Sequence, residues 1–197
     1  MGISRKVKKA VFLDRDGVIN ELIYNETGME YEPPHRTEDI KIIKGVAEAL
    51  GKLRDNGFEL FIISNQPDYA KGKTSLDNLS LVRNKFMEIL NKDREIVKED
   101  FYCYHHPEGV TDGFSIDCDC RKPKTLSVDK AVNKYEIDRS SSWMIGDRET
   151  DIECGINSQL NTILIKNKYN LYHGKVKPDY TADDLFSAAK IILNKKL

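Results

Sequence analysis

A short apolar run, Ala10–Leu13, ends directly at Asp14 and Asp16, and this junction constrains the fold more than any other segment. The run has the length and composition of a buried strand. Carboxylates at a buried strand end are costly unless other charges compensate them. Open parallel sheets bind their ligands at the carboxyl ends of their strands. The junction therefore predicts a ligand site at a sheet edge, with a solvated strand end and two incidental aspartates as the simpler alternative.

Strand and helix patterns alternate along the chain. Apolar runs typical of strands occupy 10–14, 59–64, 101–104, 142–146 and 161–165, and helical patterns occupy 45–56, 75–90, 126–135, 149–155 and 183–193. Strands separated by single helices predict an α/β fold, a Rossmann-like three-layer sandwich with a mostly parallel sheet. The length of 197 residues fits one domain covering 1–197. Residues 20–44 and 105–125 lack periodicity, so we expect them to form functional loops.

Composition excludes several classes of protein. Lysine and arginine total 31 against 32 acidic residues, a net charge of −1, which gives no support to a nucleic-acid partner. No apolar run approaches the roughly 18 residues of a membrane helix. The first apolar stretch ends after four residues, too short for a signal peptide. We therefore expect a cytoplasmic protein, a monomer with no membrane or nucleic-acid partner, whose cysteines stay reduced.

Polar residues follow three of the predicted strands. Asp14 and Asp16 follow the first, Ser64 lies at the end of the second, and Asp147 follows the fourth, while Lys122 precedes a predicted helix. In a parallel sheet these strand ends share one edge, so the side chains should converge. Carboxylates there suit Mg²⁺, which takes oxygen ligands and works with phosphate. The Ser64 hydroxyl and the Lys122 ammonium are donors suited to phosphate oxygens.

The set resembles the haloacid-dehalogenase superfamily of phosphatases, whose motifs are Asp-x-Asp, Ser/Thr, Lys and Gly-Asp-x-x-x-Asp, in that order. Here they are Asp14/Asp16, Ser64, Lys122 and the run from Gly146 to Asp151. The resemblance implies that Asp14 is the nucleophile, forming an aspartyl-phosphate. It also implies that Asp16 is the general acid and base.

The same resemblance assigns the remaining residues of the site. Mg²⁺ would be held by Asp14, the Asp16 backbone carbonyl and Asp147, and Ser64 would fix a phosphoryl oxygen. Lys122 would offset phosphoryl charge, with Asp151 orienting it. The simpler alternative for Asp151 is a helix-start charge favoured by the dipole. No large insertion interrupts the motifs, so we expect no large cap domain over the site.

Four residues of the types that bind metal ions, three cysteines and one histidine, bracket an irregular loop at about 103–120. Cys103-x-His105 is followed, after twelve residues, by Cys118-x-Cys120. Three thiolates and one imidazole match a closed structural Zn²⁺ site. Buried free cysteines beside a solvated histidine are the alternative. Because Arg121 and Lys122 follow the last ligand directly, the metal would anchor the segment that presents both cations to substrate.

This loop narrows the resemblance. The runs 103–109 and 118–123 resemble the zinc-bearing branch of D-glycero-D-manno-heptose 1,7-bisphosphate phosphatases and histidinol-phosphate phosphatases, and the twelve-residue spacing is closer to the heptose enzymes. The resemblance implies that Arg121 contacts the sugar or a second phosphate. It implies that Asn20, Asn65 and Gln66 meet sugar hydroxyls or phosphate. Segments 20–44 and 64–69 depart from the heptose pattern, and they would contact the leaving group.

Three hypotheses follow. The first is a Mg²⁺-dependent phosphomonoester hydrolase acting on a small sugar phosphate, above all D-glycero-D-manno-heptose 1,7-bisphosphate, in cell-envelope sugar synthesis. The alternative enzyme is a histidinol-phosphate phosphatase of histidine biosynthesis. The non-enzyme alternative is a catalytically inactive, zinc-stabilised binding module, against which the intact Asp14, Asp16 and Lys122 argue.

Overall fold

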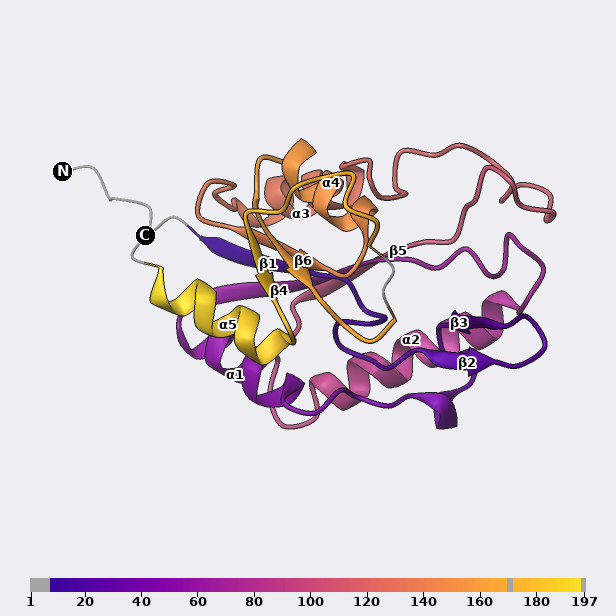
Figure 1. The fold of residues 1–197 in the computed structure, drawn as a ribbon, viewed down its shortest axis with the longest axis horizontal. Coiled ribbons are helices and arrows are strands. Elements are labelled where there is room, and N and C mark those ends of the chain that lie inside the picture. The colour runs from indigo at the N-terminus through magenta and orange to yellow at the C-terminus, as the bar shows by residue number, and fades with distance from the viewer. Residues whose placement is uncertain (1–7, 170–171, 196–197) are drawn as a thin grey trace.

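The computed structural model describes residues 8–169 and 172–195. Six strands form a sheet in the order β5-β4-β1-β6-β7-β8, and every neighbouring pair is parallel. The strands are β1 Lys9–Leu13, β4 Phe58–Asn65, β5 Glu99–Cys103, β6 Trp143–Gly146, β7 Asn161–Ile165 and β8 Tyr180–Ala182. Helices cover both faces (Figure 1), which confirms the predicted three-layer α/β fold.

The helices divide between the two faces of the sheet (Figure 1). One face carries α1 Val46–Asp55, α2 Leu76–Leu90 and α5 Leu185–Asn194, and the other carries α3 Leu126–Tyr135 and α4 Glu149–Asn157. The four apolar residues predicted on one side of the first helix are all buried: Val46, Ala49, Leu50 and Leu53. Ser75 caps the start of α2, because its hydroxyl accepts a hydrogen bond from the Asn78 N–H at 3.1 Å.

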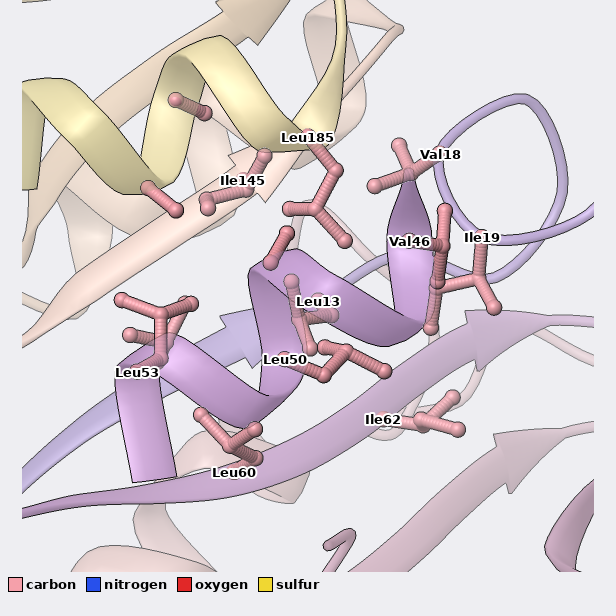
Figure 2. Packing of buried hydrophobic residues seen from close by; sticks show 14 of the residues in the cluster. Leu13, Val18, Ile19, Val46, Leu50, Leu53, Leu60, Ile62, Ile145 and Leu185 are labelled. Atoms are coloured by element: carbon pink, nitrogen blue, oxygen red, sulfur yellow. The ribbon is translucent and has the colours of Figure 1, made fainter. Parts of the chain in front are cut away.

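The larger core cluster lies between the sheet and the α1, α2 and α5 helices. Figure 2 shows Leu50 and Leu53 of α1 packed with the strand residues Leu13 and Leu60. A second cluster on the opposite face joins Phe12 and Phe61 to α3 and α4, and Cys154 is buried within it. Close packing on both faces fixes the strands relative to one another.

Two regions differ from the sequence prediction. Residues 20–44, expected to be irregular, contain an antiparallel hairpin of β2 (Ile23–Asn25) and β3 (Glu30–Glu32) and a short 3-10 helix at Thr37–Asp39. The predicted sheet also lacked β8, which extends its edge. Each missed strand spans only three residues, of which at most one is buried, so it leaves no alternating apolar pattern in the sequence.

Strand register brings the functional residues to one edge of the sheet. Leu13 lies level with Ile62 of β4 and with Ile145 of β6. Asp14, Ser64 and Asp147 follow these positions by one or two residues, so all three emerge at the same carboxyl edge. Within residues 8–169 and 172–195, no helix has the length and apolar character needed to span a membrane.

Replacing Leu50 by alanine should destabilise the fold, because its side chain is 1% exposed in the core beneath α1. The expected loss is about 2–5 kcal/mol in the free energy of unfolding. Leu81→Ala is the matched control, since Leu81 is 58% exposed and should change stability by less than about 0.5 kcal/mol. Urea denaturation followed by circular dichroism measures both, and equal losses would contradict the packing described.

Candidate active site

The Lys122 ammonium lies at the centre of the site and is almost fully buried, with 2% of the residue exposed. It donates to Asp14 Oδ1 and to the Ile63 carbonyl, both at 2.7 Å, and lies 2.7 Å from Asp151 Oδ1. Burial alone would lower the pKa of Lys122, but the charges of Asp14 and Asp151 raise it above its ordinary value. The lysine is therefore a permanent cation joined to β1, β4 and α4.

Asp151 is held in place by the start of α4. Its Oδ2 accepts a hydrogen bond from the Arg148 N–H at 3.1 Å, while Oδ1 faces Lys122. Gly146 makes room for this side chain, because a Cβ there would lie 2.1 Å from the Asp151 Cβ. The two alternatives for Asp151 thus coexist in one residue, since its carboxylate both caps the helix and contacts the lysine.

Asp147 adds a third buried carboxylate beside those of Asp14 and Asp151. Its Oδ2 accepts from Asn167 Nδ2 at 2.8 Å, whereas Oδ1 is buried and has no hydrogen-bond partner among the described residues. Burial and the charges of Asp14 and Asp151 raise the pKa of Asp147 to about 8. Ligand oxygens of these three aspartates lie within 4.8 Å of one another. The Oδ1 atom lies 3.9 Å from Arg148 Nε, its one charged neighbour of opposite sign within 4 Å in the described part of the chain. A buried oxygen without a hydrogen bond in a cluster of carboxylates fits a hard divalent cation such as Mg²⁺.

Arg15 is a site residue that the sequence analysis missed. Its Nε and Nη2 donate to the Asp16 carboxylate at 2.8–3.1 Å, and Gln66 Nε2 donates to the same group at 2.6 Å. The Gln66 amide also donates to Ser64 Oγ at 2.9 Å. Arg15 is 1% exposed. The sequence does indicate a structural role for Arg15, because an arginine directly after a buried strand requires a carboxylate partner.

Three residues expected to contact substrate have other partners. Asn20 is fully buried, where its amide accepts from the Lys41 N–H at 2.7 Å and donates to the Glu21 carbonyl, so it does not reach the cavity. Asn65 uses both ends of its amide on the Lys122 backbone, at 3.0 and 3.1 Å. Gln66, 2% exposed, turns its amide nitrogen to Asp16 and Ser64. Asn65 lines the cavity all the same, while Asn20 and Gln66 do not.

A cavity of about 320 Å³ opens above these groups. Asp14, Asp16, Ser64 and Lys122 line its inner end. The outer walls come from the β2–β3 hairpin, the segment 67–73, Arg121 and the first turn of α4. This volume suits a small molecule. The arrangement places a carboxylate nucleophile, a cation and a further carboxylate around one position that a phosphoryl group could occupy.

The Cys/His cluster lies beside this cavity, at the end of β5. Cys103 Sγ is 3.5 Å from Cys118 Sγ, which is 3.4 Å from Cys120 Sγ, and His105 Nδ1 lies 3.4 Å from Cys120 Sγ and 3.8 Å from Cys103 Sγ. The cysteines are free thiols, so no disulfide joins them. A tetrahedral ion about 2.3 Å from each sulfur requires sulfurs close to this spacing. The four donors fit a metal ion.

The fold and the site together define a phosphatase of the haloacid-dehalogenase type. A nucleophile-bearing strand end, a buried lysine and an acidic cluster meet at the carboxyl edge of a parallel sheet. A family model described as HAD-hydrolase-like matches residues 119–188.

Comparisons with known proteins place the chain more closely. It is 31% identical to a D-glycero-β-D-manno-heptose-1,7-bisphosphate 7-phosphatase of Haemophilus influenzae, covering 96% of this chain and 100% of that protein. It is 33% identical to the corresponding α-anomer enzyme of Photorhabdus laumondii, covering 93% and 96%. A solved structure of the D,D-heptose 1,7-bisphosphate phosphatase of B. bronchiseptica, complexed with magnesium and phosphate, has a TM-score of 0.76 at 22% identity and covers 94% of this chain and 98% of that one.

The chain belongs to the heptose-1,7-bisphosphate 7-phosphatase family of haloacid-dehalogenase-like hydrolases. The predicted resemblance and the predicted phosphatase class are confirmed. Phosphatases of this superfamily use Mg²⁺, which agrees with the acidic cluster around Asp147.

Gly17 provides a direct test of the acidic cluster. An added Cβ there would lie 2.1 Å from Asp147 Oδ2, and the backbone φ is +88°. Gly57 has a similar φ of +82° with nothing within 4 Å, so Gly57→Ala matches the backbone cost, about 1–2 kcal/mol, without the clash. We expect Gly17→Ala alone to raise the Mg²⁺ concentration for half-maximal activity about 10- to 100-fold. Metal titration of p-nitrophenyl phosphate hydrolysis measures this, and identical titrations for the two variants would contradict the described contact.

Proposed function

We propose that this chain is a Mg²⁺-dependent phosphomonoester hydrolase that removes the 7-phosphate of D-glycero-D-manno-heptose 1,7-bisphosphate, and that residues 1–197 act as one domain. The observation that carries the proposal is the buried contact between Lys122 and Asp14 at the inner end of the cavity. The names and coverage of the curated relatives support the substrate. Free thiols support a reducing compartment, the cytoplasm.

In the first step, a carboxylate oxygen of Asp14 attacks phosphorus and the bond from phosphorus to the leaving oxygen breaks, giving an aspartyl-phosphate. Asp16, protonated, gives its proton to the departing alkoxide. Lys122 and Ser64 donate to the phosphoryl oxygens. Held by Asp14, Asp147 and the Asp16 backbone carbonyl, Mg²⁺ would offset negative charge on the phosphoryl group.

In the second step, water attacks the phosphorus of the aspartyl-phosphate and Asp16 takes the proton of that water. The bond between phosphorus and the Asp14 oxygen breaks, which releases inorganic phosphate and restores the carboxylate. Arg15 and Gln66 hold Asp16 at the cavity as an acceptor, through the contacts at 2.6–3.1 Å. Asp151 and the Ile63 carbonyl keep Lys122 charged and in position through both steps.

A substrate panel tests the proposal. Both anomers of the heptose bisphosphate, histidinol phosphate and simple hexose phosphates would be compared by phosphate release at saturating Mg²⁺. We expect kcat/KM for one heptose anomer to exceed that for histidinol phosphate at least about tenfold, a difference near 1.4 kcal/mol. Asp14→Asn should abolish turnover, by at least about 10³-fold in kcat.

Two outcomes would contradict the proposed function. A tenfold preference for histidinol phosphate would favour the alternative enzyme, whose support is the run from Glu32 to His35 beside the cavity wall, a departure from the heptose pattern. Absence of turnover with every ester, in a protein unchanged by Asp14→Asn, would favour the binding module.

The Cys/His cluster should carry one Zn²⁺ per chain, held by Cys103, His105, Cys118 and Cys120. We expect Cys118→Ser to lose most of the zinc, because a closed tetrahedral site needs all four donors. Cys154→Ala is the control, because Cys154 packs in the core cluster beneath α3 and α4, outside the Cys/His group, so this variant should keep its zinc. Elemental analysis of protein purified without chelators measures the content. A zinc-free wild type, or equal loss in both variants, would contradict this assignment.

A further inference from the structure

The segment 67–73, directly after β4, forms one wall of the cavity and carries two lysines. Pro67, Asp68, Lys71 and Lys73 line the cavity. The segment is folded back on itself, since the Lys71 N–H donates to the Pro67 carbonyl at 2.9 Å and the Lys73 N–H donates to the Asp68 carbonyl at 2.8 Å. Lys71 and Lys73 therefore lie at defined places on this wall.

The Cys/His loop holds this segment in place. The Val110 and Thr111 N–H groups donate to the Ala70 carbonyl at 2.7 and 3.1 Å, and the Thr111 hydroxyl donates to the Tyr69 carbonyl at 2.8 Å. The Tyr69 ring meets Phe114 edge-on, with centroids 4.8 Å apart. Phe114 in turn stacks on the imidazole of His105, with centroids 5.5 Å apart. The proposed metal ligands and the 67–73 wall are thus one packed unit.

Most charges on this wall are already paired. Lys73 contacts Glu30 at 2.6 Å and also Glu32, both on the β2–β3 hairpin. Asp68 lies 2.7 Å from His35 Nε2. Lys73 and Asp68 therefore have partners of opposite charge within the protein, which weakens their attraction for a charged group of the substrate.

Lys71 differs from these residues. Its side chain makes no hydrogen bond or ion pair within 4 Å among the residues that the structure describes, although it lines the cavity. Arg121, also in the lining, has one side-chain hydrogen bond in the same part of the chain, a long one of 3.4 Å to the His105 carbonyl. Neither Lys71 nor Arg121 has a carboxylate within 4 Å in the part of the chain that the structure describes, and both line the cavity.

We propose that Lys71 binds a second anionic group of the substrate, remote from the phosphoryl group that is hydrolysed, alongside Arg121. This inference rests on the proposed function and names the part of the leaving group that the 67–73 wall recognises. An unpaired ammonium in a concave site attracts a phosphate or carboxylate strongly, because charge-assisted hydrogen bonds form there with little competing solvent. The same cations disfavour a cationic leaving group such as histidinol.

Kinetics on two substrates test the inference. Lys71→Ala should raise KM for the heptose bisphosphate about tenfold, the effect of losing one charge-assisted contact, and change kcat less than twofold. KM for p-nitrophenyl phosphate, which has no second anionic group, should stay within twofold of wild type. Lys71→Arg should keep most of the affinity for the bisphosphate. Lys92→Ala, an exposed lysine outside the cavity lining, is the matched control and should change neither KM.

A second measurement tests the role of Lys71 without depending on which ester is the natural substrate. Fructose 1,6-bisphosphate and fructose 6-phosphate would be compared as inhibitors of p-nitrophenyl phosphate hydrolysis. The preference for the bisphosphate should fall about tenfold in Lys71→Ala relative to wild type. If wild type cleaves p-nitrophenyl phosphate but not the heptose ester, the proposed function fails while this ratio still decides the role of Lys71. An unchanged ratio overturns the role.

Discussion

The buried Lys122 ammonium is the interaction on which the rest of the site depends. Three parts of the chain supply its partners: Asp14 after β1, Ile63 in β4 and Asp151 at the start of α4. Its single positive charge lies among three aspartates, because Asp147 joins Asp14 and Asp151 within 4.8 Å, and burial with this crowding raises the pKa of Asp147 to about 8. With all three carboxylates ionised the inner end of the cavity would carry a net negative charge, and it would repel a phosphate. A divalent cation and the substrate should bind as a pair for this reason.

The Cys/His loop connects the chemistry to the recognition of the leaving group. On one side the chain continues from Cys120 into Arg121 and Lys122. The Asn65 amide hydrogen-bonds both the N–H and the carbonyl of Lys122. On the other side the loop holds the 67–73 wall through Thr111 and the stacked rings of Phe114 and His105. One bound metal ion would thus order both ends of the cavity, although the ion itself touches neither substrate nor the reacting atoms.

The five longer strands and the five α-helices were predictable from the sequence, because they depend on local apolar patterns, whereas the short strands β2, β3 and β8 were not. The helix at 126–135 matched its predicted bounds, and Asp14, Ser64, Lys122 and Asp147 meet at one edge as parallel strands require. Side-chain direction was not predictable. Asn20 was expected to face substrate, yet backbone groups of Lys41 and Glu21 satisfy its amide away from the cavity, whereas Asn65 lines the cavity with its amide bonded to the Lys122 backbone. Asn167, which holds Asp147, follows a strand end that carried no motif.

Beryllium fluoride, which mimics a phosphoryl group on a carboxylate, gives the most direct test that Asp14 is the phosphorylated residue. A crystal structure of the protein with Mg²⁺ and beryllium fluoride should show the fluoride adduct on the Asp14 carboxylate, within hydrogen-bond distance of Lys122 Nζ. An adduct on any other side chain, with Asp14 unmodified in crystals that still turn over substrate, would contradict the role given to Asp14.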